Sequence, residues 1–449
     1  MALVSYAFRV RRPCGLLLLT GAWLFSESTP FAALNGFFAW RGVLNQYTGA
    51  LAMGVMSLAI ILAVRPRWLE GPLDGLDKLY RLHKWLGIAG LTLAVTHWLL
   101  AKVPKWLVGW GWLERPKRGP RPPLEPGSLE QIFAQQRGLA ESVGEWAFYA
   151  AAVLMILALI KWFPYRRFMQ THKWIAVAYL VLVFHSVVLV KFAYWSQPIG
   201  PLLAVLMALG SVAAVMSLFG VRASGRKVAG HVTAIQPYPA LDALGVEIAL
   251  APGWPGHQAG QFAFVTLHGD EGAHPFTLAS AWDPEQARVQ VVIKSLGDYT
   301  GALAQRLRVG DAVQLEGPYG CFTFAGEARR QIWVAGGIGV TPFMARLQAR
   351  AEQGDDREVD FFYCTAQYEP MLIEPLQALA KQAGVRLHVW WNQRDGRLDV
   401  AQLQARTPGW READVWFCGP AGFGHSLREG LCGEGLPAAR FHQELFEMR

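Results

Sequence analysis

Four histidines lie in apolar stretches of the first 220 residues, and each stretch is long enough to cross a lipid bilayer. His83 and His97 lie on one stretch, and His172 and His185 lie on another, with spacings of 14 and 13 residues. An ionisable side chain at membrane depth is costly and marks a functional position by default. Two pairs at matching depths predict axial ligands for two stacked haems, and therefore a chain that carries electrons through a membrane.

Hydropathy divides the chain near residue 220. A membrane span needs about 20 helical residues, and the sequence predicts an all-α bundle of six spans near 13–33, 43–64, 80–101, 143–163, 170–191 and 198–219. The first of these is interrupted by Glu27 and Pro30. The basic run Arg9–Arg12 before it resembles the start of a signal peptide. No clear cleavage site follows that run, so we expect a first membrane helix instead.

Charge divides the chain at the same place. Residues 1–220 carry 21 Lys and Arg against 9 Asp and Glu, whereas the remainder carries 21 against 25. The basic pI of about 9.3 therefore indicates basic flanks of membrane helices, and no nucleic-acid partner is expected. Basic residues before the first span and in the loops after the second and fourth predict that both termini lie in the cytoplasm, at a bacterial-type plasma membrane. The proline-rich linker 102–141 is also basic, although this topology places it outside, and it argues against the assignment.

The sequence beyond residue 221 is typical of a soluble protein. Residues 226–322 hold short strand-like runs broken by Gly and Pro, which predicts a small antiparallel β-barrel. Residues 330–449 alternate apolar strands with helical stretches, which predicts a parallel α/β sheet. The five cysteines form no iron–sulfur or covalent-haem spacing, and they fit a reducing compartment.

Helix geometry treats the two histidine spacings differently. On an ideal helix, 14 residues return to within about 40° of the starting face, so His83 and His97 face one way. Thirteen residues leave His185 roughly 140° from His172, so a π-bulge, a bend or a rotated ring is needed. Structural interior histidines, and a zinc or copper site, remain as alternatives. A haem iron fits better than zinc because it needs only two axial imidazoles, and no Cys or carboxylate lies near the pairs.

Two motifs in the predicted barrel have the features of a flavin site. The run His274-Pro275-Phe276-Thr277 is followed by Ser280, and the small hydroxyls of Thr277 and Ser280 can bond the polar edge of a flavin. Further along, Lys294 offers positive charge, and the turn of Gly297, Asp298 and Thr300 offers backbone N–H groups for a pyrophosphate. Either motif taken alone is also compatible with an ordinary strand and turn.

Two motifs in the α/β part point to a dinucleotide. The loop Gly336-Gly337-Ile338-Gly339-Val340-Thr341-Pro342 follows the first strand. Its glycines let the backbone approach a phosphate, the next helix presents free N–H groups, and Pro342 suits the first helical turn. The run Phe417-Cys418-Gly419-Pro420 closes the last strand. Cys418 can touch a nicotinamide there, and a buried strand cysteine is the alternative.

Together these residues resemble the ferric reductase / NADPH oxidase family over nearly the whole chain. The shared features are the two histidine spacings, HPFT at 274–277, Gly317–Gly320, GGIGVTP at 336–342 and CGP at 418–420. That family joins a six-helix, two-haem membrane domain to a ferredoxin–NADP reductase-type module. The resemblance implies a transmembrane di-haem domain at 1–222, an FAD-binding β-barrel domain at 223–326 and an NAD(P)-binding α/β domain at 327–449.

The resemblance also implies roles for individual residues. FAD would be contacted by residues of the HPFT motif and the following turn, namely His274, Pro275, Phe276, Thr277, Ser280, Lys294, Gly297, Asp298 and Thr300. The dinucleotide pyrophosphate would be bound by the glycine loop, through Gly336, Gly337, Gly339, Thr341 and Pro342. Cys418, Gly419 and Pro420 would lie by the nicotinamide, and Phe446 would cover the flavin ring. His83 and His172 would hold the inner haem, and His97 and His185 the outer one.

Three features depart from the family pattern. One turn beyond His97 stands Ala101, where eukaryotic oxidases carry a further histidine, and this weakens a dedicated superoxide-producing role. The run Cys364–Gln367 lacks the arginine that binds a 2′-phosphate, so NADH stays open beside NADPH unless Arg394 or Arg397 substitutes. Phe446 is followed by three more residues, so it covers the flavin less simply than a terminal aromatic does.

The expectation from the sequence is a transmembrane oxidoreductase. It passes electrons from cytoplasmic NAD(P)H through FAD and two b-type haems to an external acceptor. Ferric iron or a ferric chelate is expected first, and dioxygen giving superoxide or a periplasmic redox protein are the alternatives. A haem-sensing or transport protein without turnover is disfavoured by the intact flavin and nucleotide motifs.

Overall fold

The structure is a computed structural model that describes residues 15–114, 123–160, 162–163, 165–220, 226–267, 272–296 and 298–444. The chain folds into two compact units. The helical unit comprises chiefly Val10–Pro66 and Leu79–Ala223. The sheet unit comprises chiefly Arg67–Lys78 and Ser224–Met448.

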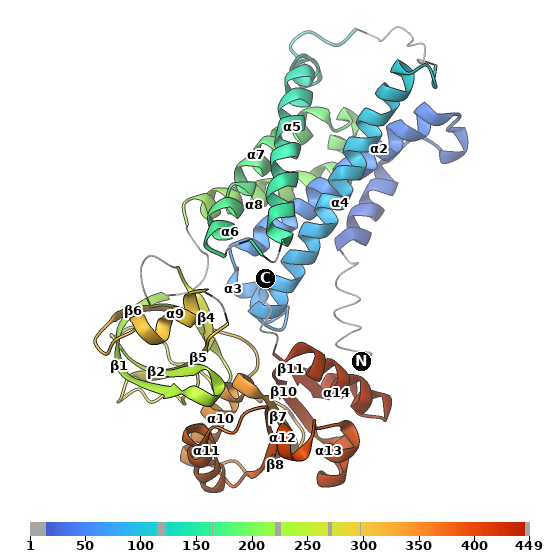
Figure 1. Ribbon diagram of the computed structural model, residues 1–449. Coiled ribbons are helices and arrows are strands. Elements are labelled where there is room, and N and C mark those ends of the chain that lie inside the picture. The colour runs from blue at the N-terminus through green and yellow to red at the C-terminus, as the bar shows by residue number, and fades with distance from the viewer. Residues whose placement is uncertain are drawn as a thin grey trace. The chain divides into compact units, whose positions relative to one another are not determined.

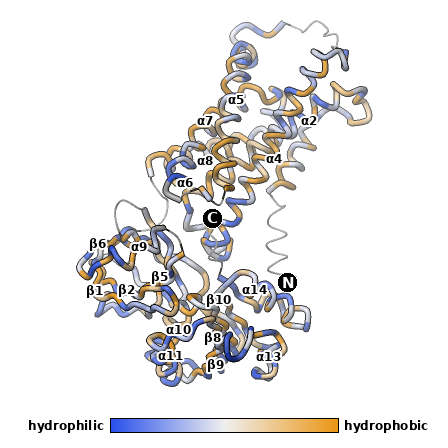
Figure 2. The backbone as a smooth tube through the Cα atoms, in the orientation of Figure 1, coloured by the Kyte–Doolittle hydropathy of each residue, from blue (hydrophilic) through white to orange (hydrophobic). Residues whose placement is uncertain are grey.

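Five helical segments of the described chain are long and apolar enough to cross a membrane (Figure 1). They are α2 (Phe37–Ala63), α4 (Leu76–Gly109), α5 (Leu129–Leu159), the segment Arg167–Leu189, and α8 (Ile199–Leu218). Figure 2 shows many apolar residues along these helices. Three short elements accompany them, namely η1 (Phe31–Ala33), α3 (Arg67–Glu70) and η2 (Phe192–Ser196). These spans confirm the prediction of a multi-pass membrane protein.

The first predicted span is shorter than expected in the described residues. Its helix there is Gly15–Ser26, which is below the length of a full span. The buried carboxylate of Glu27 follows, and it accepts hydrogen bonds from Thr29 N at 2.9 Å, from Lys191 Nζ at 3.0 Å and from the Tyr194 hydroxyl. The carboxylate of Glu27 is therefore held in place by three partners where the apolar stretch ends.

The first sheet of the sheet unit is antiparallel, as predicted. Its strand order is β4-β3-β6-β1-β2-β5. The strands are β1 (Arg226–Tyr238), β2 (Ala243–Leu250), β3 (Phe262–Thr266), β4 (His274–Thr277), β5 (Arg288–Lys294) and β6 (Ala312–Tyr319). Leu278, directly after β4, bridges to Val291 of β5, and both belong to the apolar core of this sheet. The connections include η3 (Pro239–Leu241) and α9 (Asp298–Arg306).

The second sheet is parallel, as predicted, with the order β11-β10-β7-β8-β9. Its strands are β7 (Arg330–Gly336), β8 (Glu358–Thr365), β9 (Arg386–Trp391), β10 (Asp414–Cys418) and β11 (Phe441–Gln443). The helical connections are η4 (Gly337–Val340), α10 (Thr341–Gln353), α11 (Pro370–Gln382), α12 (Asn392–Asp395), α13 (Val400–Arg406), η5 (Trp410–Glu412), α14 (Ala421–Gly433) and η6 (Ala438–Arg440). All residues of β10 are buried, which is expected for a parallel strand that is covered on both faces.

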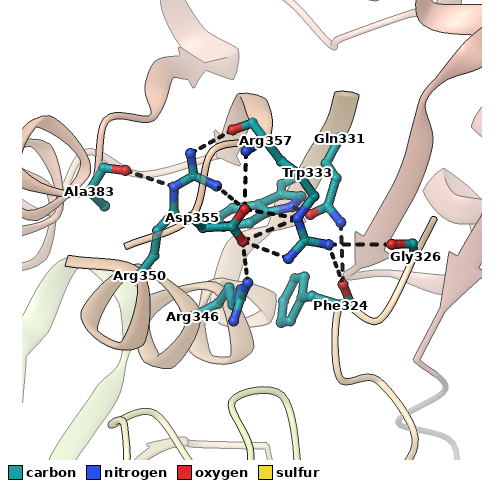
Figure 3. A network of polar contacts seen from close by, with 9 residues as sticks. All are labelled: Phe324, Gly326, Gln331, Trp333, Arg346, Arg350, Asp355, Arg357 and Ala383. Carbon is teal, nitrogen blue, oxygen red and sulfur yellow. Dashed lines mark hydrogen bonds and ion pairs between the residues drawn. The ribbon is translucent and has the colours of Figure 1, made fainter. Parts of the chain in front are cut away.

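A buried ion cluster fixes the carboxyl end of α10 (Figure 3). Asp355 lies 2.5 Å from Arg346, 2.6 Å from Arg357 and 3.5 Å from Arg350. The pKa of Asp355 is lowered chiefly because Arg357 donates hydrogen bonds to its carboxylate. Arg350 Nε also donates to the carbonyl of Ala383 at 2.7 Å. The cluster therefore anchors the helix that begins at the glycine loop.

Candidate functional site

The structure brings the four predicted histidines together as two facing pairs. The ring centroids of His83 and His172 lie 6.1 Å apart, and those of His97 and His185 lie 6.4 Å apart. A metal–imidazole bond is about 2 Å long, so two rings on opposite sides of one metal ion are expected with centroids about 6 Å apart. Both pairs have the separation that a shared metal ion requires.

Backbone carbonyls determine which ring nitrogen carries the proton. His83 Nδ1 bonds to Ala59 O at 2.8 Å, His97 Nδ1 to Asn45 O at 2.9 Å, and His185 Nδ1 to Ala140 O at 2.8 Å. A carbonyl oxygen can only accept, so each Nδ1 is the donor and each Nε2 keeps its lone pair. This arrangement orients an imidazole for metal binding. The Nδ1 of His172 is buried and has no hydrogen-bond partner among the described residues.

The 13-residue spacing is accommodated by a break in the helix. The helix α6 (Tyr165–His172) ends at the first histidine, and α7 (Ile175–Leu189) begins three residues later. Lys173 and Trp174 form a turn between them. His83 and His97, by contrast, lie on the single helix α4. The interruption frees His185 from the direction that a straight helix would impose.

Two glycines that the sequence reasoning missed lie against the outer histidines. A Cβ at Gly49 of α2 would lie 2.9 Å from His97 Cε1, and a Cβ at Gly144 of α5 would lie 2.0 Å from His185 Nδ1. At Gly138, which also lies on α5, an added Cβ would have no atom within 4 Å. Gly144 is therefore needed for the close approach of the His185 ring. Glycine within an apolar helix gives no such signal in the sequence.

The histidine pairs fit haem better than a metal ion held by side chains alone. Among the described residues, no group of three or more His, Cys, Asp or Glu side chains can hold a metal ion. Two imidazoles alone leave a zinc or copper ion with too few ligands. A haem iron takes its remaining ligands from the porphyrin, so two axial histidines are sufficient.

The predicted flavin residues lie around the ends of β4 and β5. His274 stacks on Tyr299, with ring centroids 4.5 Å apart. The Thr277 hydroxyl is buried and has no hydrogen-bond partner in the described part of the chain, so a bound group with a polar edge would satisfy it. Ser280 Oγ accepts from Gln290 N at 3.0 Å, and Thr300 Oγ1 accepts from Leu296 N at 2.9 Å.

The other predicted flavin residues lie on the same two strands and at the start of the helix that follows β5. Pro275 and Phe276 lie on β4, Lys294 ends β5, and Asp298 begins α9. Gly297 lies outside the described residues.

The glycine loop and the Cys418–Pro420 run meet at the carboxyl edge of the parallel sheet. The strand β7 is flanked by β8 on one side and by β10 on the other, so the strand order reverses at β7. Open α/β sheets bind ligands at such a switch point. A Cβ at Gly339 would lie 2.2 Å from Cys418 O, and a Cβ at Gly336 would lie 2.6 Å from Pro420 Cδ.

The remaining residues of these two motifs lie at the same edge of the sheet. Gly419 also requires the absence of a side chain, because a Cβ there would lie 2.9 Å from the Gly336 backbone. Gly337 has a positive φ of 56° and open space around it. Thr341 and Pro342 form the first turn of α10. The glycines at 336, 339 and 419 therefore allow the close packing of the two loops, whereas Gly337 has open space around it.

A carboxyl group that the sequence reasoning missed lies next to Cys418. Glu444 directly follows β11, and Cys418 Sγ lies 3.9 Å from its Oε2. Burial raises the pKa of Cys418 well above its usual range, and burial does the same for Glu444. Cys418 is therefore a neutral thiol, suited to packing beside a ring and unsuited to nucleophilic attack. Phe446, the predicted flavin cover, lies outside the described residues.

Three family models match this chain in succession. The ferric reductase like transmembrane component matches residues 48–183. An FAD-binding domain matches residues 232–323, and an oxidoreductase NAD-binding domain matches residues 333–429. The three matches follow the order that the sequence motifs predict.

Curated relatives match only part of the chain. The heme-dependent oxidative N-demethylase beta subunit of Ectopseudomonas mendocina is 35% identical over 204 residues, which are 44% of this chain and 62% of the relative. A flavohemoprotein of Pseudomonas putida is 29% identical over 193 residues, or 40% of this chain and 48% of the relative. A flavohemoprotein of Halalkalibacterium halodurans is 26% identical over 205 residues, or 40% and 50%. The chain thus spans between about half and three fifths of the length of these relatives.

Proposed function

We propose that this chain, which its three domain matches identify as a ferric reductase/NADPH oxidase-type fusion, moves electrons from cytoplasmic NAD(P)H across a membrane to an external acceptor. A ferric chelate is the acceptor that we propose first. The observation that carries the proposal is the geometry of the two facing histidine pairs on the membrane helices. Two metal-spaced pairs at two depths give a route across the bilayer rather than a single site.

We assign one b-type haem to each pair, with His83 and His172 inside and His97 and His185 outside. When bound, FAD takes a hydride from NAD(P)H, and the haems carry its electrons singly. The histidines supply Nε2 lone pairs whose direction is fixed by bonds from Nδ1 to carbonyls. The four rings are only partly buried in the protein itself, as expected for rings that a bound group covers.

The sheet unit supplies the donor side of the reaction. The Thr277 hydroxyl and the His274–Tyr299 stack are proposed to hold the flavin, together with Lys294 and Thr300. The glycine loop is proposed to bind the dinucleotide pyrophosphate at the start of α10, where the positive end of the helix dipole favours an anion. Cys418 and Glu444 then exclude water beside the nicotinamide, since both are buried and neutral.

One contact within the sheet unit supports the proposed topology. The segment Arg67–Lys78, which follows the second span, belongs to this unit, and its Glu70 accepts a hydrogen bond from Gly320 N at 2.7 Å. The loop after the second span therefore shares a side of the membrane with the nucleotide domains. We propose that this side is the cytoplasm of a bacterial-type cell, and that both termini lie there.

Three details of the fold are also proposed, namely a sixth membrane span, the closure of the barrel and the domain boundaries. We propose that Gly15–Ser26 belongs to a sixth span, and that the antiparallel sheet closes as a barrel through the Leu278–Val291 bridge. The domain boundaries that we propose are those expected from the sequence, at 1–222, 223–326 and 327–449.

Proteoliposomes test the direction and the acceptor together. The full chain is reconstituted, NADH or NADPH is added outside, and a ferric chelate is enclosed with a ferrous-specific dye. We expect the enclosed chelate to be reduced under anaerobic conditions, and we expect His97→Ala to abolish this reduction while NAD(P)H still reduces the flavin. Reduction that occurs only when chelate and NAD(P)H share a side of the membrane would contradict transmembrane transfer.

Oxygen serves as the competing acceptor in the same vesicles. Aerobic NAD(P)H oxidation that is insensitive to the chelate and produces superoxide would favour the oxidase alternative. The purified protein is expected to contain two low-spin b-type haems per chain. One haem, or none, would remove the route across the bilayer.

A further inference from the structure

A polar cluster joins α4 to α5 beside the outer histidine pair. Lys102 Nζ lies 2.6 Å from Glu145 Oε1 and donates to Glu145 Oε2 at 2.7 Å. The Tyr149 hydroxyl donates to Glu145 Oε1 at 2.6 Å and accepts from Trp98 Nε1 at 3.2 Å. Trp98 and Lys102 belong to α4, whereas Glu145 and Tyr149 belong to α5. The hydrogen bonds that the described residues form between α4 and α5 all belong to this cluster.

The two charges of the cluster mark the same boundary on their helices. No Asp, Glu, Lys or Arg stands between Lys84 and Lys102 on α4, or between Glu145 and the end of α5 at Leu159. A charged side chain at the edge of such an apolar stretch is costly and marks a function by default. Removing one partner of a poorly solvated ion pair leaves the other charge without compensation. The pair is therefore formed or lost as a unit.

The cluster adjoins the two outer histidines along the chain and in space. Trp98 directly follows His97 on α4. Glu145 directly follows Gly144 on α5, and a Cβ at Gly144 would lie 2.0 Å from His185 Nδ1. A contact between α4 and α5 at this level therefore acts on the backbone segments that carry or touch both rings.

Different helices direct the two rings of the outer pair. His97 Nδ1 donates to Asn45 O on α2, whereas His185 Nδ1 donates to Ala140 O on α5. The two ring planes cross at 87°. The angle between the rings thus depends on where α5 lies relative to α4 and α2. The polar cluster is the connection that holds α5 against α4 at this level.

We infer that Lys102 and Glu145 are positioning residues for the outer histidine pair. Their ion pair, completed by Tyr149 and Trp98, fixes the spacing and the angle of the two rings by holding α4 and α5 together. The charge-assisted bonds to the carboxylate are the strong contacts of this connection. The inference rests on the proposed function, which assigns one haem to the outer pair.

The test is electron paramagnetic resonance of the oxidised, full-length protein, together with its haem content. The spectrum of a low-spin ferric haem depends on the angle between its two imidazole planes, because both rings act on the same iron d orbitals. The signal that is missing from His97→Ala is that of the outer haem. We expect Lys102→Gln and Glu145→Gln each to shift this signal and to weaken haem binding at the outer site about tenfold, the loss typical of residues that orient metal ligands. The inner signal should not change.

Two further variants separate positioning from a simple change of charge. The double variant Lys102→Glu/Glu145→Lys re-forms the ion pair with its charges exchanged, and it should return the outer signal and the haem content to nearly wild-type values. Arg137→Gln is the matched control, because it also removes a positive charge from this region. Arg137 pairs with Glu141 at 3.0 Å on the same helix, so it does not connect α4 to α5. The outer signal should be unchanged in this control.

An outer signal that is unchanged in both single variants would overturn the inference, and so would an exchanged pair as defective as either of them. An equal shift in Arg137→Gln would assign the effect to charge alone and would also overturn it. If a single variant loses both haem signals, Tyr149→Phe decides, because it keeps both charges and removes one bond to the carboxylate. A shift of the outer signal alone then supports the inference, and no shift overturns it. A wild type without any low-spin haem signal would contradict the proposed function itself, and the inference with it.

Discussion

The helical unit and the sheet unit assemble their sites in different ways. In the helical unit, four imidazoles form two facing pairs because of where each histidine lies along its helix and which face of the helix it occupies. In the sheet unit, residues that are far apart in the chain meet because strand order places the ends of β7, β10 and β11 side by side. Position along a helix decides the first site, and sheet topology decides the second. Different mutations should therefore disrupt the two sites.

The helical unit itself uses two solutions. The α4 histidines rely on the period of one continuous helix of 34 residues. The positions of His172 and His185 depend on the turn at Lys173–Trp174, which separates two shorter helices. A continuous helix transmits a change of register along its length, whereas a turn can absorb one.

The largest expected effect comes from inserting one alanine into α4 between Ile88 and Ala89. An added residue rotates the rest of the helix by about 100° and shifts it by about 1.5 Å. One histidine of α4 then leaves its partner, and we expect the haem content to fall from two per chain to one. The same insertion between Lys173 and Trp174 should retain two haems, because it falls in the turn. Equal loss from both insertions would contradict the difference between the two segments.

A smaller but sharper effect is expected from Gly144→Ala. The new Cβ would lie 2.0 Å from His185 Nδ1, so the ring must move and lose its bond to Ala140 O. Overpacking of this kind costs about 1–3 kcal/mol. We expect reduced occupancy of the outer haem only, measured from the absorbance of reduced haem. Gly138→Ala, on the same helix and in open space, is the matched control and should retain both haems.

The sequence predicted the histidine pairs and the two sheets because each has a local signature. Apolar length, the 14-residue spacing and the glycine loop can all be read in a short window. The turn at Lys173–Trp174 could not be predicted, because His172–Ile175 contains neither Gly nor Pro. Its position depends on packing between helices, which no local pattern reports.

Glu444 and Gly144 were missed for related reasons. Glu444 reaches Cys418 only because β10 and β11 pair in parallel, and the two residues are 26 positions apart. Gly144 matters only because His185 lies against it. Both roles arise from tertiary contacts, so they become visible once the sheet order and the helix packing are known.

In the sheet unit, Thr277→Val tests a site made by topology. Valine keeps the shape of threonine and removes the buried hydroxyl that has no partner among the described residues. We expect FAD affinity to fall about tenfold, the usual loss for one hydrogen bond of about 1 kcal/mol or more. Thermal stability of the flavin-free protein should not fall, since no bond is lost there. Thr266→Val on the neighbouring strand β3 is the control, and equal affinity loss in both variants would argue against a flavin contact at Thr277.

The smallest effect is expected from a change of pH, which acts on the hydrogen bonds of Asp360 on β8 with Arg386 and His388 on β9. Asp360 is buried, and burial alone would raise its pKa, but bonds from Arg386 and His388 lower it from 3.8 to about 2. A depressed pKa means that this stabilisation is present above about pH 4 and is lost as the pH falls toward 2. Nearly two pKa units correspond to about 2.5 kcal/mol, and the exposure of Arg386, which is 57%, reduces this to about 1 kcal/mol.

Amide hydrogen exchange of β9, corrected for the intrinsic rate, should therefore accelerate between pH 5 and pH 3 by about twofold, because only about half of this stabilisation of about 1 kcal/mol is lost above pH 3. Asp360→Asn removes the titrating group, so its β9 exchange should already be fast at pH 5 and should change little on acidification. The amide exchange of α4 should show neither the acid acceleration of the wild type nor the change caused by Asp360→Asn, because Asp360 lies on β8 and makes these bonds to β9. A pH response of β9 that persists in Asp360→Asn would assign the acid sensitivity to another carboxylate, and Asp414, which bonds His442 across β10 and β11, would be the next to test.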